Sequence, residues 1–116
     1  MRFWIPLLLP AVLSACATPP LDPLPPLSKP SAAATVTVRR PADIVGAPAT
    51  MFVVIENRRV YGLKNGGSWS FKIDPGMYRF GYDQGFNVCR KRVEVEPNRR
   101  YLIKLSPVCS FEPQVL

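Results

Sequence analysis

The chain changes character near residue 34, where hydrophobic and polar positions begin to alternate with a period of two. Beyond that point β-branched and aromatic residues recur at this spacing, and turn-forming residues interrupt them every several positions. A period of two is that of a half-buried β-strand, and no window has the spacing of an amphipathic helix. The pattern predicts seven strands, at residues 35–39, 51–56, 60–63, 68–73, 77–83, 88–96 and 100–106.

Seven short strands in about 80 residues are typical of a sandwich or a barrel. We expect an all-β fold, a small antiparallel β-sandwich that covers residues 33–116. A loop with Pro41, Gly46 and Pro48 follows the first strand.

The last two strands fit a hairpin whose three-residue loop is Asn98, Arg99 and Arg100. In this register the hydrophobic residues share one face and opposite charges meet on the other, as a stable antiparallel pair requires. A four-residue loop is the alternative, and it would shift every pair by one. The three-residue register places Cys89 opposite Cys109, Val93 opposite Leu105, Val95 opposite Ile103 and Glu94 opposite Lys104.

A second hairpin is predicted at residues 74–77, where Pro75 fixes φ and Gly76 accepts a positive φ. It would place Phe71 opposite Phe80 and Trp69 opposite Tyr82. Because these aromatic residues alternate with polar ones, we interpret them as core and not as a ligand platform. On the other face, Lys72 would lie opposite Arg79.

The amino-terminal residues have the layout of a secretory signal. Arg2 precedes an apolar stretch, Phe3 to Leu13, which ends in small residues. The stretch is too short to span about 30 Å of hydrocarbon, and two prolines interrupt it. We expect residues 1–15 to be a signal peptide.

At the end of this segment, Leu13-Ser14-Ala15-Cys16 resembles the lipobox of bacterial lipoproteins. The resemblance implies that Cys16 is diacylated, that cleavage occurs before it, and that a further acyl chain, such as palmitate, modifies the new amino terminus. Three acyl chains anchor a protein stably. Ala17 stands where an aspartate would favour the inner membrane, so the resemblance implies the periplasmic face of the outer membrane. An ordinary export signal that ends near a cysteine is the alternative.

Residues 16–32 are predicted to be a linker, because six prolines occur between positions 17 and 30. Proline neither continues a helix nor donates to a sheet, so this stretch should be extended polyproline II. At roughly 3.1 Å per residue it would hold the domain about 40 Å from the lipid. Pro20 and Pro23 also make a PxxP match, which is the alternative of a ligand for an aromatic groove.

If Cys16 is lipidated, Cys89 and Cys109 remain, an even number in an exported domain. A bridge between them would close a loop of about 20 residues and stabilise the fold by roughly 3 kcal/mol. A redox site is the alternative, but the chain has no CxxC spacing and no histidine.

The composition excludes several kinds of chemistry. Without histidine, the chain has no histidine triad, histidine base or histidine metal ligand, and three cysteines are too few for a four-thiolate zinc site. Glu94 and Glu96 fit salt bridges better than acid–base catalysis, and Gly66-Gly67 lacks the helix of a phosphate loop. We therefore expect no enzyme, cofactor, metal site or small-molecule substrate.

The positive charge is the remaining feature. From residue 30 onward there are 13 Lys and Arg against 7 Asp and Glu, a net charge of +6. An anionic partner would explain like charges that oppose each other, and ordinary solubility charge is the alternative. In the envelope such a partner would be a headgroup, lipopolysaccharide, the cell wall or an acidic protein, and not nucleic acid. The candidate contacts are Arg58, Arg59, Lys72, Arg79, Arg90 and Arg92.

Residues 33–106 resemble an uncharacterised family of small Gram-negative lipoproteins. The similarity lies in the run from Ala34 to Pro41, in Ile44-Val45-Gly46, in the segment from Val60 to Gly66, and in the Pro-Gly turn at residues 74–76. The hairpins also look like PEGA-type surface domains. Glu56-Asn57 departs from the usual Asp-Gly, but asparagine tolerates the left-handed region, so the turn should survive. Neither family implies a reaction.

Together these features predict a lipid-anchored envelope protein that acts as a non-catalytic binding or assembly module. The alternative from another class is an inhibitor of an exported enzyme, which would present a loop such as residues 42–50 or 83–87.

Overall fold

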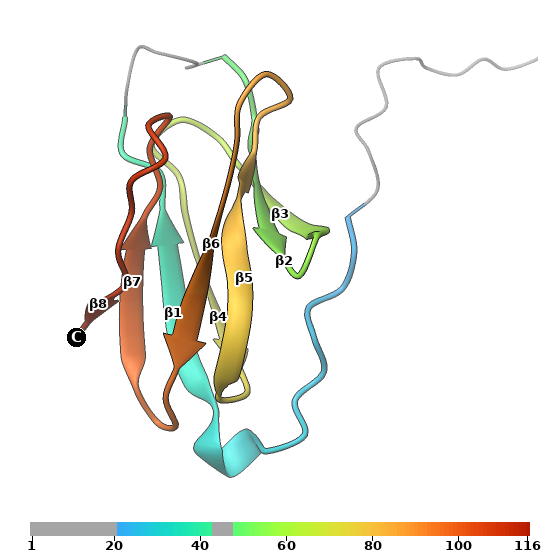
Figure 1. The fold of residues 1–116 in the computed structure, drawn as a ribbon, viewed down its shortest axis with the longest axis vertical. Helices are drawn as coiled ribbons and strands as arrows, with labels where there is room; N and C mark the ends of the chain where they lie inside the picture. The colour runs from blue at the N-terminus through green and yellow to red at the C-terminus, as the bar shows by residue number, and fades with distance from the viewer. Residues whose placement is uncertain (1–20, 43–47) are drawn as a thin grey trace, which may run out of the picture.

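The computed structural model describes residues 21–42 and 48–116, which form a two-layer β-sandwich (Figure 1). One sheet has the strand order β4-β1-β7-β8 and the other β3-β2-β5-β6. The sandwich and its seven strands are confirmed, and β8 adds a short eighth strand. A 3₁₀ turn, Pro30–Ala32, leads into β1. The strands are β1 (Ala34–Arg39), β2 (Met51–Ile55), β3 (Arg58–Leu63), β4 (Ser68–Ile73), β5 (Gly76–Asp83), β6 (Val88–Val95), β7 (Arg100–Lys104) and β8 (Gln114–Val115).

The predicted pairing of the last two strands is wrong. β6 pairs with β5, whereas β7 belongs to the other sheet and pairs with β1, in parallel. Glu94 therefore lies opposite Met77 and not Lys104. The inward face was predicted correctly, since Val93 and Ile103 are both buried. Alternation determines which face a residue occupies, but it does not determine the partner strand.

The segment between β4 and β5 also crosses from one sheet to the other instead of closing a hairpin. β4 pairs with β1, so Lys72 lies opposite Thr35 and not opposite Arg79. Phe71 and Phe80 do meet, but across the core, with ring centroids 5.9 Å apart. Trp69 stacks on Tyr61 at 4.4 Å and does not oppose Tyr82.

One predicted turn and the disulfide bridge follow the sequence analysis. Glu56 and Asn57 join β2 to β3 with positive φ values of 51° and 64°, so this turn accommodates asparagine as expected. The disulfide between Cys89 and Cys109 is present, with the two Cα atoms 5.4 Å apart. It joins the start of β6 to the loop between β7 and β8.

The described part of the linker is not a free spacer. Residues 21–29, here called the strap, run along the sandwich (Figure 1). The Asp22 N–H donates to the Arg59 carbonyl at 2.7 Å, and Leu24 packs against the core. At the other end, the Asp74 carboxylate accepts hydrogen bonds from the Ser28 N–H and hydroxyl and from the Lys29 N–H. Proline prevents regular pairing, but leucines and backbone donors between the prolines still dock.

The signal segment and Cys16 lie outside the described residues. Within residues 21–42 and 48–116, no helix has the length and apolar character needed to cross a bilayer.

Candidate functional site

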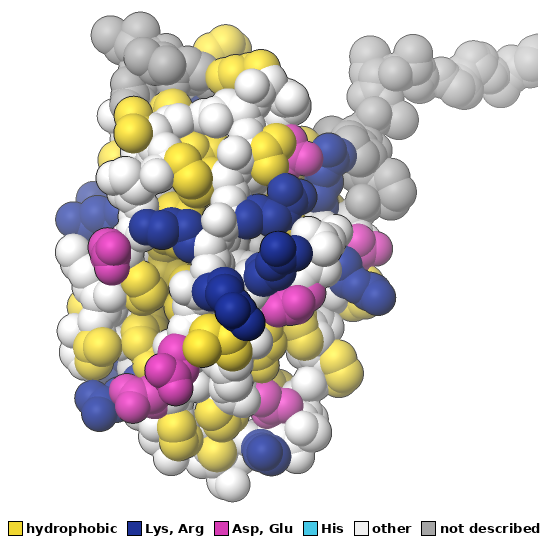
Figure 2. All heavy atoms as spheres, in the orientation of Figure 1, with side chains coloured by type: hydrophobic (Ala, Val, Ile, Leu, Met, Phe, Trp, Pro, Cys, Tyr) yellow, Lys and Arg dark blue, Asp and Glu magenta, His cyan; other side chains and the backbone are white. Residues whose placement is uncertain are grey.

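The candidate site lies on the outer face of the sheet β3-β2-β5-β6. Strand alternation buries Phe80, Tyr82 and Val93 in the core and turns Arg79, Arg90 and Arg92 to solvent. The space-filling view shows Lys and Arg side chains gathered over the middle of β5 and β6 (Figure 2).

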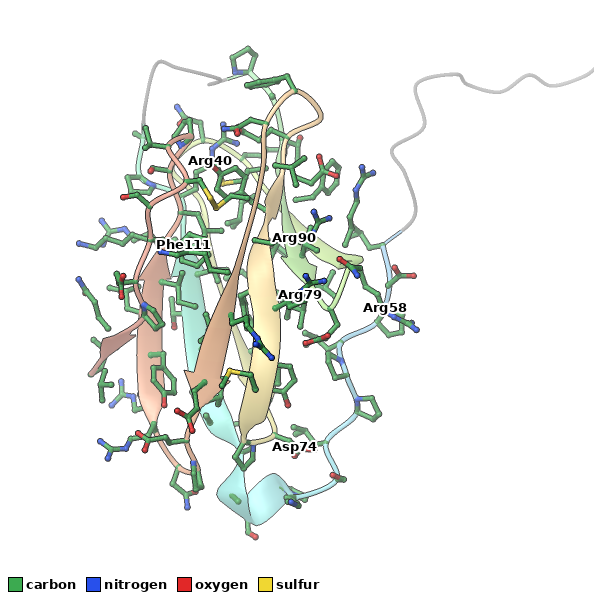
Figure 3. The ribbon with its side chains drawn as sticks, in the orientation of Figure 1. Arg40, Arg58, Asp74, Arg79, Arg90 and Phe111 are labelled. Atoms are coloured by element: carbon green, nitrogen blue, oxygen red, sulfur yellow. A yellow bond between two sulfur atoms is a disulfide. The ribbon has the colours of Figure 1, made fainter. Side chains whose placement is uncertain are left out.

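The register brings the arginines together. Arg79 lies directly opposite Arg92, and Arg90 lies opposite Gly81. Figure 3 labels Arg79 and Arg90 on these two strands. Like charges that face each other across an antiparallel pair are destabilising. The opposed pair predicted from the sequence, Lys72 with Arg79, is therefore wrong, and Arg79 lies opposite Arg92 instead.

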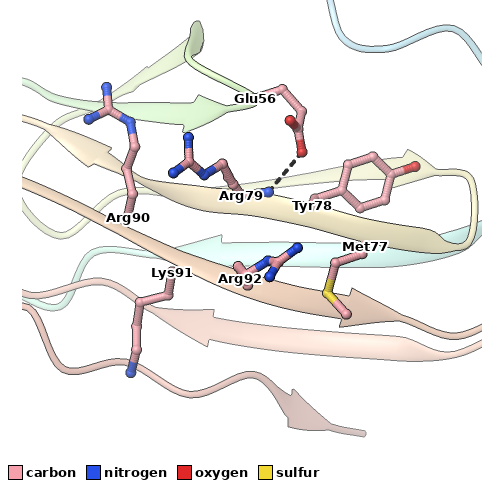
Figure 4. A pocket seen from close by; sticks show the side chains of 7 residues that line it. All are labelled: Glu56, Met77, Tyr78, Arg79, Arg90, Lys91 and Arg92. Carbon is pink, nitrogen blue, oxygen red and sulfur yellow. Dashed lines mark hydrogen bonds between the residues drawn. The ribbon is translucent and has the colours of Figure 1, made fainter.

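A shallow hollow of about 550 Å³ adjoins the arginines (Figure 4). Its lining residues are Glu56, Met77, Tyr78, Arg79, Arg90, Lys91 and Arg92. Glu56 uses its carboxylate to accept the Arg79 backbone N–H at 2.8 Å. Lys91 points away from the other lining residues, and its Nζ donates to the Phe111 carbonyl.

Among the described residues, no carboxylate forms an ion pair with Arg79, Arg90 or Arg92. The nearby Asp83 carboxylate forms an ion pair with Arg59 instead, with Nη2 and Oδ2 2.8 Å apart. Burial alone would raise the pKa of Asp83. The hydrogen bonds from Arg59 and the Gly85 N–H and the charges of Arg59 and Arg90 outweigh burial, so the pKa of this carboxyl lies below its usual range. Asp83 therefore stays ionised at neutral pH.

Gly81 permits the close approach of β5 and β6 at this face. A Cβ at this position would lie 1.7 Å from the Cys89 carbonyl oxygen, a separation that no side chain tolerates. The absence of a side chain leaves bare backbone beside Arg90.

In Figure 4, the Arg79 and Arg90 side chains both extend toward the strands β2 and β3.

The six candidate residues do not form one site. Arg79, Arg90 and Arg92 come together, whereas Lys72 is on the other sheet. Arg59 pairs with Asp83 and lies over the Phe52 ring at 5.1 Å from its centroid. Arg58 lines an apolar hollow of about 330 Å³ beneath the strap.

Sequence reasoning missed a buried arginine. Arg40 is only 2% exposed, and its Nη1 donates to the carbonyls of Ala49 and Leu63 at 2.7 and 2.9 Å. These acceptors lie 9 and 23 positions away. No local pattern indicates such a contact, so the sequence contains no signal for it.

The described residues contain no cluster of three or more His, Cys, Asp or Glu side chains that would hold a metal ion. Asp43 and the other residues between 42 and 48 lie outside the described ranges. What the described face offers chemically is a set of guanidinium donors for an anion.

Comparisons with known proteins give the fold. No family model matches the chain, and no curated protein matches it. The chain is similar to the solved N-terminal domain of AlgF from P. aeruginosa, with a TM-score of 0.58 and 18% identity. The match covers 76% of this chain and 98% of that domain. At this identity the likeness shows the β-sandwich alone.

Proposed function

We propose that the protein is a lipid-anchored lipoprotein of the bacterial envelope, on the periplasmic face of the outer membrane. Its sandwich acts as a non-catalytic binding or assembly module, and an anionic partner docks on Arg79, Arg90 and Arg92. The observation that carries the proposal is the opposition of Arg79 and Arg92 with no carboxylate paired to either among the described residues.

The chemistry of arginine supports an anionic partner. A guanidinium presents several N–H donors in a planar fork that matches carboxylate and phosphate oxygens. Two arginines at opposed strand positions repel each other in the free protein, and an anion bound beside them removes that repulsion. A phosphate or carboxylate polymer of the envelope has this chemistry.

The disulfide supports export. Bridges such as Cys89–Cys109 persist in oxidising compartments, which include the bacterial periplasm. The match of residues 13–16 to a lipobox supports an anchor at Cys16. The two-sheet architecture is compatible with the proposed similarity to small Gram-negative lipoproteins.

Capture of envelope material by the purified full chain tests the proposal. The double variant Arg90→Glu/Arg92→Glu should lower capture in low salt at least about tenfold, which corresponds to about 1.4 kcal/mol. The control Lys72→Glu/Lys104→Glu makes the same charge change on exposed positions of the other sheet. It should retain capture.

Unchanged capture by the arginine variant would contradict the electrostatic role. Recovery of a single stoichiometric hydrolase, equally with both variants, would favour the inhibitor instead. The residue 83–87 loop would then be the segment to mutate, since most of the 42–50 loop lies outside the described residues.

A further inference from the structure

One end of the sandwich exposes large hydrophobic side chains. Phe86 is 68% exposed, Val88 47% and Val108 69%. They belong to the β5–β6 turn, the start of β6 and the loop after β7, and we call these three residues the apolar tip. The two loops, 84–87 and 106–110, contain no carboxylate.

The tip is held together by covalent and hydrogen bonds. The Cys89–Cys109 disulfide joins the start of β6 to the 106–110 loop, and Asn87 Nδ2 donates to the Pro107 carbonyl. Within the turn, the Gln84 N–H donates to the Asn87 carbonyl at 2.8 Å. Because the loops are fixed by these bonds, their hydrophobic side chains project from a prearranged surface.

The chemical character of the outward-facing side chains of β6 changes stepwise with distance from the tip. Val88, Arg90, Arg92 and Glu94 follow one another at two-residue intervals, about 7 Å apart. This order runs from a hydrophobic residue through two cations to an anion. It matches an anionic membrane interface, in which the hydrocarbon lies deepest, the anionic headgroups follow and water lies outermost. Arginine stems extend to place their charge among headgroups.

The strap keeps this end near the membrane that holds Cys16. Asp22 is bound to Arg59, and Arg59 is paired with Asp83, which precedes the tip turn. Five residues lie between Cys16 and Asp22, so the connection has six Cα-to-Cα steps and spans at most about 21 Å. Gly81 lies level with Arg59, since both are register partners of Val54. The five Cα-to-Cα steps from Gly81 to Phe86 span at most about 17 Å, so the connection is long enough for the tip to reach the lipid.

We infer that the apolar tip inserts into the interface of the lipid bilayer that anchors Cys16, and that Arg90 contacts the phosphates of its headgroups. The inference rests on the proposed lipid anchor and names the anionic partner as the anchoring membrane. The tip and the anchor then fix the orientation of the sandwich on the lipid surface.

Tryptophan quenching by brominated lipids tests the inference. The full chain with both native tryptophans removed, Trp4→Phe and Trp69→Phe, is the blank. Phe86→Trp, Val108→Trp and Met77→Trp are added to it one at a time. Met77 is 54% exposed near the opposite end of β5 and is the matched control. In vesicles of phosphatidylethanolamine and phosphatidylglycerol, the tip tryptophans should be quenched about twofold more than the control.

Quenching that is equal at all three positions, or greatest at position 77, would overturn the inference. So would a concentration-dependent blue shift of the tip tryptophans without vesicles, which would mean that a second copy covers the tip. Mass spectrometry of the same sample reports the acyl chains on Cys16. An acylated chain with an unquenched tip refutes this inference alone, whereas an unacylated chain refutes the proposed anchor.

Discussion

At the scale of single residues, the directly opposed positions of Arg79 and Arg92 lower the stability of the fold. Cross-strand pairs change stability by roughly 0.2–1 kcal/mol. Arg79→Gln should therefore raise the free energy of unfolding by about 0.5 kcal/mol, measured by urea denaturation at low ionic strength. Added salt should reduce the difference, because it screens the repulsion in the parent protein.

Lys72→Gln is the control for this effect, because Lys72 lies opposite Thr35. It removes one positive charge without relieving a directly opposed pair. A gain of the same size in both variants would attribute the effect to net charge and not to the arginine pair.

Single residues also show what the sequence could predict. The burial of Val93 and Ile103 follows from alternation, and the bridge follows from the count of cysteines. The pairing of Arg79 with Arg92 requires the strand register, which alternation leaves open. The sequence around Gly81 does not indicate that a side chain there would clash with the Cys89 carbonyl, because Cys89 is on the neighbouring strand.

At the scale of elements, the Asp74 carboxylate holds the strap through hydrogen bonds. The strap groups that donate these hydrogen bonds also favour the ionised form of the carboxylate. Hydrogen bonds from the Ser28 N–H, the Ser28 hydroxyl and the Lys29 N–H, with the charge of Lys29, hold the pKa of Asp74 below its ordinary value of 3.8. A carboxyl whose pKa is lower in the folded state stabilises that state above its unfolded pKa. The contribution is lost as the pH falls through the folded pKa.

We expect the amide protons of Ser28 and Lys29 to shift together with a midpoint below pH 3.8, followed by NMR. Asp74→Asn should abolish this transition and remove the matching part of the acid-induced loss of stability. A midpoint at or above 3.8 would show that the strap is not held by the ionised carboxylate.

Strand positions could be predicted because alternation is a local property, but strand partners could not. Pairing of β1 with β4 and with β7 depends on contacts between residues far apart in the chain. The strap was missed for a related reason. The six prolines indicate an extended segment, whereas the acceptors on Arg59 and Asp74 that dock it belong to distant elements.

At the scale of the whole molecule, the disulfide contributes to stability and to the shape of the tip. Its loop spans 20 residues, for which chain entropy predicts roughly 3 kcal/mol. Cys89→Ser and Cys109→Ser should lower the melting temperature equally under oxidising conditions. Reducing agent should bring the parent protein to the same value and leave the variants unchanged. Equal melting temperatures for parent and variants would remove the bridge from the account.

The central claim is that the outer face of β5 and β6 binds an anionic partner, and the salt dependence of capture tests it most directly. Envelope material is captured with the parent protein and with Arg79→Gln/Arg92→Gln over a series of salt concentrations. The account predicts weaker capture by the variant and a shallower dependence on salt, because two charged contacts are lost. Equal capture with an equal salt dependence would contradict it.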